Sequence, residues 1–97
     1  MVLKSEIIET LKTTYDPELG IDLYTLGLIY TIDFDQKKQK LHLTMTLTSP
    51  MCPFGPQILE MLQRKFKELG LKSPKISLVF DPPWEPSVEV RQMLGVG

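Results

Sequence analysis

The sequence has one cysteine, Cys52, and one histidine, His42, among its 97 residues. A single cysteine cannot form a disulfide within the chain, and closed zinc or iron–sulfur sites usually take four protein ligands. His42 lies ten residues before Cys52 on an expected strand, too far along it to serve as the base for a nucleophilic thiol. A disulfide scaffold, a closed metal centre within one chain and a cysteine hydrolase are therefore all poorly supported.

Long apolar runs and an excess of one charge are also absent. No run of 18 apolar residues is present to span a bilayer, and the N-terminus lacks the basic-then-apolar order of a secretory signal. With 11 basic and 12 acidic residues the net charge is −1, which gives no electrostatic case for binding nucleic acid or an anionic membrane. These absences predict a cytoplasmic protein of a reducing compartment, without nucleic acid or membrane among its partners.

The residues that are present suit one globular domain covering residues 1–97. Hydrophobic residues make up 42% of the chain and charged residues 24%, which is ordinary for folded proteins. Helical spacing of apolar residues predicts helices over about 3–14, 55–70 and 88–94, with Ser87 as a cap for the last of them. Alternation of apolar and polar residues predicts strands over 28–35, 41–48 and 75–80.

The element order α-β-β-α-β-α predicts an α+β fold, a two-layer α/β sandwich. We expect a three-stranded mixed sheet with the helices on one face. The inward side of the third strand should carry Ile76, Leu78 and Phe80. The opposite sheet face should be polar and wet, and the residues expected there are His42, Thr44, Thr46 and Ser77.

Proline surrounds the single cysteine. Pro50, Pro53 and Pro56 stiffen the segment that carries Cys52, and a helix is expected to begin directly after it. Unpaired N–H groups at a helix start favour the thiolate over the thiol. Cys52 could therefore act as a nucleophile, a redox thiol or a soft metal ligand, and the interpretation as a buried structural thiol remains open.

As a metal ligand, Cys52 requires a site shared between molecules. A second Cys52 across a homodimer, a partner protein or a small thiol would each supply further ligands. Asp16, Glu18 and Asp22 offer oxygen ligands, although carboxylates suit harder cations than a thiolate does. A shared site of this kind would be labile, which suits transfer better than storage.

Two further segments have alternative interpretations. The acidic loop Asp16-Pro17-Glu18 is either a solvated turn or part of a functional site. Trp84 lies in the proline-rich stretch Asp81–Pro86, where it either covers the core or forms an interaction surface.

Four motifs occur in a fixed order along the chain: Asp16-Pro17-Glu18, Leu26-Gly27-Leu28-Ile29-Tyr30, Thr48-x-x-x-Cys52-Pro53 and Asp81-Pro82-Pro83-Trp84-x-Pro86. Together they resemble the metal–sulfur cluster biosynthesis domain family, which includes SufT-like and PaaD-like iron–sulfur assembly domains. The resemblance covers the chain from the first helix through Trp84. It departs from the family pattern at Tyr24-Thr25, where a valine-aspartate pair is usual, and at Ser49, where threonine is common.

The resemblance implies the iron–sulfur assembly domain fold and a role in maturing iron–sulfur proteins, as an accessory factor and not as an enzyme. It implies a site of Asp16, Glu18, Thr48 and Cys52, with Leu19 and Ser49 beside them. Iron–sulfur scaffold, carrier or client proteins would be its partners. No cofactor would be bound stably, and an iron–sulfur cluster would be held only transiently.

Two other functions remain open from the residues alone. One is a thiol-dependent enzyme that uses Cys52 with Asp16 or Glu18 as the acid–base partner. The other is a pure protein-interaction module in which Cys52 is structural. For the assembly factor, and equally for the thiol-dependent enzyme, we expect Asp16, Glu18, Thr48 and Cys52 to converge on one surface depression at an end of the sheet.

Overall fold

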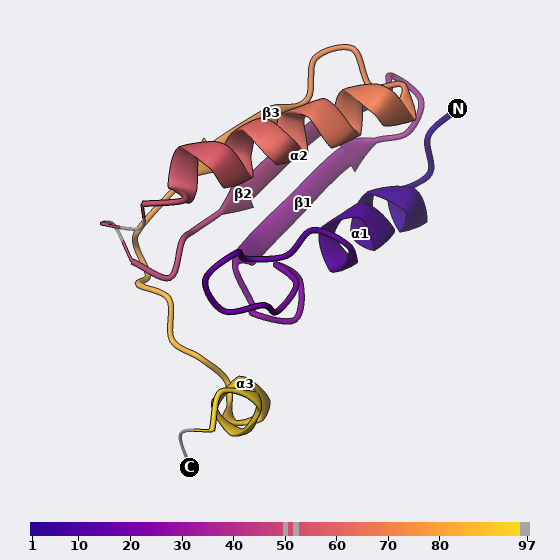
Figure 1. Ribbon diagram of the computed structural model, residues 1–97. Coiled ribbons are helices and arrows are strands. Elements are labelled where there is room, and N and C mark those ends of the chain that lie inside the picture. Colours follow the sequence, from indigo (N-terminus) through magenta and orange to yellow (C-terminus); the bar gives the residue numbers. More distant parts are fainter. Residues whose placement is uncertain (50, 52, 96–97) are drawn as a thin grey trace.

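The structure, a computed structural model of the chain, describes residues 1–49, 51 and 53–95 (Figure 1). The helices and strands follow the order expected from the sequence. In chain order they are α1 (Lys4–Lys12), β1 (Ile29–Asp35), β2 (Lys40–Met45), α2 (Gly55–Leu69), β3 (Lys75–Leu78) and α3 (Val88–Met93).

The sheet is mixed and has the strand order β1-β2-β3. Strands β1 and β2 form an antiparallel hairpin whose register runs from Ile29 opposite Met45 to Asp35 opposite Lys40. Strands β2 and β3 are parallel, and α2 provides the crossover that a parallel pair requires. The expected three-stranded mixed sheet is confirmed.

Helices α1 and α2 contact one another and lie over one face of the sheet (Figure 1). The core forms between these two layers, because each helix has one apolar stripe and each strand alternates its side chains between the two faces. The fully buried side chains of this core include Ile7 and Leu11 of α1, Leu43 and Met45 of β2, and Ile58, Leu62 and Phe66 of α2.

The short helix α3 lies beyond one end of the sheet, at the end of an extended segment (Figure 1). Its first turn is capped as expected, since the Oγ of Ser87 accepts a hydrogen bond from the N–H of Val90 at 3.2 Å. Among the described residues, no helix is both long and apolar enough to cross a bilayer.

Several elements are shorter than the sequence predicted. Helix α1 ends at Lys12 and not at residue 14, because the hydroxyls of Thr13 and Thr14 donate back to the carbonyls of Glu9 and Thr10, at 3.0 and 2.7 Å. Strand β2 ends at Met45 and not at residue 48, and β3 ends at Leu78 and not at residue 80.

Two predictions of side-chain orientation were wrong for related reasons. Thr46 is fully buried and does not lie on a wet face. Thr46 follows the last residue of β2, so it lies beyond the regular strand in which the alternation holds. Phe80 is 40% exposed instead of facing inward, because it lies beyond the end of β3, where a proline-rich stretch begins.

Candidate functional site

The acidic loop is held together by the carboxylate of Asp16. This side chain is only 2% exposed, and its Oδ1 accepts the backbone N–H groups of Glu18 at 2.8 Å and Leu19 at 3.0 Å. The backbone of Asp16 closes the same loop, because its N–H donates to the carbonyl of Ile21 and its carbonyl accepts from the N–H of Gly20. Asp16 is therefore a positioning residue for the loop that follows it.

Glu18 and Leu19 occupy the loop that Asp16 organises. The side chain of Glu18 is exposed, whereas Leu19 is half-buried against the hydrophobic core. Since Oδ1 of Asp16 is already bonded to backbone N–H groups, Glu18 presents the more accessible negative charge of the pair. The sequence analysis gave the two acids the same role, but Asp16 is buried and Glu18 is exposed.

The chain continues from this loop through a second turn into β1. The Oδ2 of Asp22 accepts the N–H of Thr25 at 2.9 Å, and Gly27 closes the turn with a φ of +78° that glycine adopts readily. Asp22 therefore caps this turn. At the start of the segment, the ammonium of Lys65 on α2 donates to the hydroxyl of Thr14 at 2.9 Å. This hydrogen bond connects the beginning of the loop segment after α1 to helix α2.

Thr48 and Ser49 lie after the end of β2. Thr48 is half-buried, and the Oγ of exposed Ser49 accepts the N–H of Met51 at 3.1 Å. Cys52 itself, with Pro50, lies outside the described residues.

The two ends of the cysteine-bearing segment approach one another closely. A Cβ placed on Gly55 at the start of α2 would lie 2.7 Å from the Cδ1 of Leu47, so a larger residue would collide with Leu47 unless that side chain moved. Both Leu47 and Gly55 are buried. Leu47 and Gly55, which stand before and after this segment in the chain, therefore lie side by side in the core.

The acidic loop and the cysteine-bearing segment lie at the same end of the sheet (Figure 1). The reason is topological, since the start of β1 and the end of β2 are neighbours in an antiparallel hairpin. A hydrogen bond of 2.8 Å from the N–H of Thr46 to the carbonyl of Leu28 joins the two strands at this end. The structure brings the loops of Asp16, Glu18 and Thr48 to one end, while their convergence with Cys52 on one depression stays a prediction.

His42 has no part in this arrangement. It lies on the sheet face away from α1 and α2, half-buried, with its Nε2 2.7 Å from the Oγ of Ser77 on β3. Its expected position on the polar sheet face is confirmed. Among the described residues, no three His, Cys, Asp or Glu side chains are grouped so that they could hold a metal ion.

Trp84 fastens the proline-rich stretch to the start of β1. Its side chain is half-buried against the core, and its Nε1–H donates to the carbonyl of Leu26 at 2.7 Å. Nearby, the hydroxyl of Tyr30 donates to the carbonyl of Pro82 at 2.8 Å. Two of the four sequence motifs therefore contact each other, which supports the interpretation of Trp84 as a cover for the core. A role for Trp84 in interactions stays a prediction.

Replacing Trp84 with phenylalanine is expected to lower the free energy of unfolding by about 1–2 kcal/mol. Phenylalanine keeps an aromatic ring at this position, but it lacks the indole N–H. The carbonyl of Leu26 therefore loses its donor, and a hydrogen bond of this kind contributes roughly 1 kcal/mol. Urea denaturation of both proteins measures the difference, with Tyr24→Phe as a control at an exposed aromatic residue. An unchanged midpoint for Trp84→Phe would show that this bond does not fasten the stretch.

The comparisons with known proteins agree with the motifs. Residues 4–78 match the sequence model of a family described as "Iron-sulfur cluster assembly protein". The Fe-S protein maturation auxiliary factor YitW of Bacillus subtilis is 40% identical over 83 residues, which cover 84% of this chain and 80% of that protein. The Fe-S protein maturation auxiliary factor SufT of Staphylococcus aureus is 40% identical over 70 residues, which cover 71% of this chain and 78% of that protein.

A solved structure shares both the fold and the sequence pattern. A conserved hypothetical protein from Thermotoga maritima has a TM-score of 0.83 and 38% sequence identity, over 98% of this chain and 96% of the other. The match of the family model, the identity to the maturation factors and the shared architecture all point the same way. This chain belongs to the iron–sulfur cluster assembly protein family.

Proposed function

We propose that this protein assists the transfer of iron–sulfur clusters to client proteins through the thiol of Cys52, with the acidic loop beside it. The observation that carries the proposal is the placement of the loops. The described residues that flank Cys52, from Leu47 to Ser49 and from Gly55 on, lie at the same end of the sheet as the acidic loop, and Leu47 and Gly55 approach each other closely. Relatives named Fe-S protein maturation auxiliary factors support the same function.

The proposed roles follow from the chemistry of each group. A thiolate is a soft ligand for iron, and one sulfur per chain holds a cluster only together with ligands from another molecule. Asp16 keeps the acidic loop in shape, and the exposed carboxylate of Glu18 contacts the partner. Thr48 supplies a hydroxyl beside the cysteine-bearing segment, where it donates to sulfur or to a carboxylate.

This function is that of an accessory factor that acts with scaffold, carrier or client proteins, with a homodimer as one way to complete the ligands. The competing thiol-dependent enzyme needs a base near the sulfur. His42 is hydrogen-bonded to Ser77, and Oδ1 of Asp16 is bonded to its own loop. Of the described residues considered as the base for the thiol, this leaves Glu18. The reducing cytoplasmic location expected from the sequence stays a prediction.

Anaerobic reconstitution with iron and sulfide tests the proposal directly. With a small thiol present, we expect the wild-type chain to acquire the visible absorption of an iron–sulfur cluster, with about one cluster per two chains, because two chains supply two of the four terminal ligands and the small thiol supplies the others. Native mass measurement should then show two chains joined by the cluster. Cys52→Ser should acquire none, whereas Lys67→Gln, an exposed substitution on α2 that keeps the thiol, should load as the wild type does.

Two results would count against this function. Loading of Cys52→Ser with a cluster as fully as the wild type would remove the thiol from the mechanism. A stable cluster on a strict monomer without added thiol would instead show that the cluster does not bridge two molecules.

A further inference from the structure

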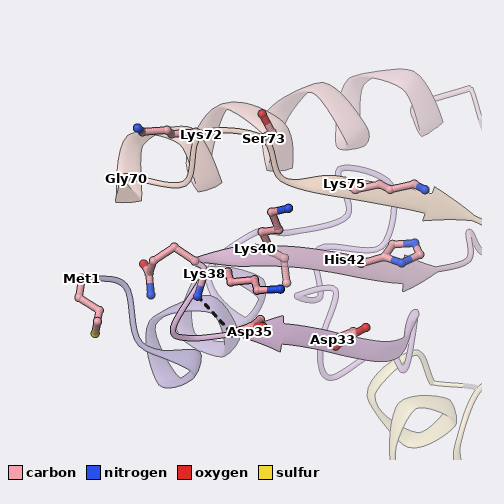
Figure 2. A pocket seen from close by; sticks show the side chains of 12 residues that line it. Met1, Asp33, Asp35, Lys38, Lys40, His42, Gly70, Lys72, Ser73 and Lys75 are labelled. Atoms are coloured by element: carbon pink, nitrogen blue, oxygen red, sulfur yellow. Dashed lines mark hydrogen bonds between the residues drawn. The ribbon is translucent and has the colours of Figure 1, made fainter.

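A hollow of about 940 Å³ lies over the sheet and its hairpin end, away from the acidic loop (Figure 2). Its lining includes side chains from both outer strands of the sheet. Lysines enter it from four places, with Lys38 on the hairpin, Lys40 on β2, Lys72 after α2 and Lys75 on β3. We call this feature the basic hollow.

The basic hollow is positive in a chain whose net charge is negative. Its four lysines and its two aspartates, Asp33 and Asp35, give the lining a formal charge of +2. Since the whole chain carries −1, the rest of the chain carries −3. Positive charge is therefore concentrated at this place.

The strand register divides the hollow into two sides. Asp33 of β1 lies opposite His42 of β2, which in turn lies opposite Lys75 of β3. The negatively charged side chains of the hollow lie on β1. The lysines lie on β2, on β3, in the loop before β3 and in the hairpin connection. One carboxylate is already partly engaged, because the Oδ1 of Asp35 accepts the N–H of Lys38 at 3.1 Å.

No carboxylate of the described residues lies within 4 Å of the ammonium group of a lysine in the hollow, although Asp35 is the cross-strand partner of Lys40. In the described part of the chain, the one ion pair within 4 Å joins Arg64 and Glu68 on the exposed side of α2. The ammonium groups of the hollow thus keep their charge available for another molecule, and long lysine side chains can adjust to it.

We propose that the basic hollow binds an extended acidic segment of a partner protein. The lysines come from four separate places and do not converge on one point, which suits several carboxylates better than one phosphate group. Gly70 at the C-terminal end of α2 also lines the hollow, and the partial negative charge of a helix end disfavours a compact dianion there. Nucleic acid fits less well, because Asp33 and Asp35 face the hollow and its lining has no Phe, Tyr or Trp for base stacking.

This inference goes beyond the proposed function and does not depend on it. Lys40 begins β2, whereas the segment with Cys52 follows the end of that strand at Met45. Six residues of strand separate the two by roughly 17–20 Å. A partner held at the basic hollow leaves the other end of the sheet open for a second protein.

Fluorescence anisotropy with a labelled decaglutamate peptide tests the proposal on the full chain. We expect binding that weakens between about 50 and about 150 mM salt, as surface charge interactions are screened. Lys40→Gln/Lys75→Gln should raise the Kd about 3- to 30-fold, the range for losing two exposed charge contacts. Lys37→Gln/Lys67→Gln, which changes the net charge equally outside the hollow, should leave the Kd within about 2-fold.

Asp33→Asn provides a test of opposite sign. It removes a negative charge from the hollow, so the Kd should fall by about 2- to 5-fold.

Equal weakening by both lysine pairs would overturn the proposal in favour of non-specific charge attraction. Tighter binding of a single-stranded oligonucleotide than of decaglutamate would assign the hollow to nucleic acid. Self-association that Lys40→Gln/Lys75→Gln abolishes would assign it to a second copy of the chain.

Discussion

Replacing Asp16 with alanine is expected to lower the free energy of unfolding by about 2–4 kcal/mol. The carboxylate is 2% exposed, and its Oδ1 accepts two backbone N–H groups at 2.8 and 3.0 Å. Hydrogen bonds to a charged group contribute roughly 1.5–3 kcal/mol each, and water can replace part of this at the exposed residue Glu18. The loop between Asp16 and Gly20 should lose its shape together with this stability.

Asp16→Asn is the matched control. The amide oxygen can accept the same two N–H groups without the charge, so we expect this variant to lose no more than about 1 kcal/mol. Urea denaturation at neutral pH compares the three proteins. An alanine variant as stable as the wild type would show that the carboxylate does not position the loop.

Replacing Cys52 with serine is expected to abolish cluster transfer and to leave the free energy of unfolding within about 0.5 kcal/mol of the wild type. The thiol is the one soft ligand we assign, and serine cannot replace it. Its alkylation should be rapid below about pH 8.5, the ordinary pKa of a cysteine, because the start of α2 follows three residues later and favours an anion.

A core substitution provides the reference for the unfolding measurement. Leu62 is fully buried on α2, and Leu62→Ala should lower the free energy of unfolding by about 2–5 kcal/mol. If Cys52→Ser lost as much, and if the wild-type thiol reacted slowly below about pH 8.5, then Cys52 would be a buried structural thiol. The assignment of Cys52 as a functional ligand would then be wrong.

The element order could be predicted because each segment has one clear period. On α2 the residues Ile58, Leu62 and Phe66 recur at helical spacing, and all three are fully buried. On β2 the apolar residues Leu41 and Leu43 alternate with polar ones and are buried as well. Two such helices and three such strands leave few arrangements other than a two-layer sandwich.

The ends of the strands could not be predicted in the same way. Thr46 continues the alternation of β2 in the sequence, yet it is fully buried. Thr46 lies after the last residue of β2, and the point where that strand ends depends on its pairing with both neighbours, which has no local signature. Phe80 likewise depends on where pairing with β2 stops, and β3 extends only to Leu78.

The sequence named residues for the candidate site, but it did not show the structural role of Asp16 or the partner of Trp84. An acid in a loop is usually solvated, whereas Asp16 is buried because it accepts two N–H groups from its own loop. An aspartate followed by proline is a known turn former, so this role had a local signal. The bond from Trp84 to Leu26 joins residues 58 positions apart, and no local pattern reveals such a partner.

The most direct test of the account measures the maturation of an apo-ferredoxin in the presence of iron, a cysteine desulfurase, cysteine and a scaffold protein. The rate at which the ferredoxin gains its visible circular dichroism reports cluster delivery. We predict that the wild-type chain accelerates delivery several-fold and that Cys52→Ser, folded to the same extent, does not. Equal acceleration by Cys52→Ser would contradict the central claim that this protein acts through its single thiol.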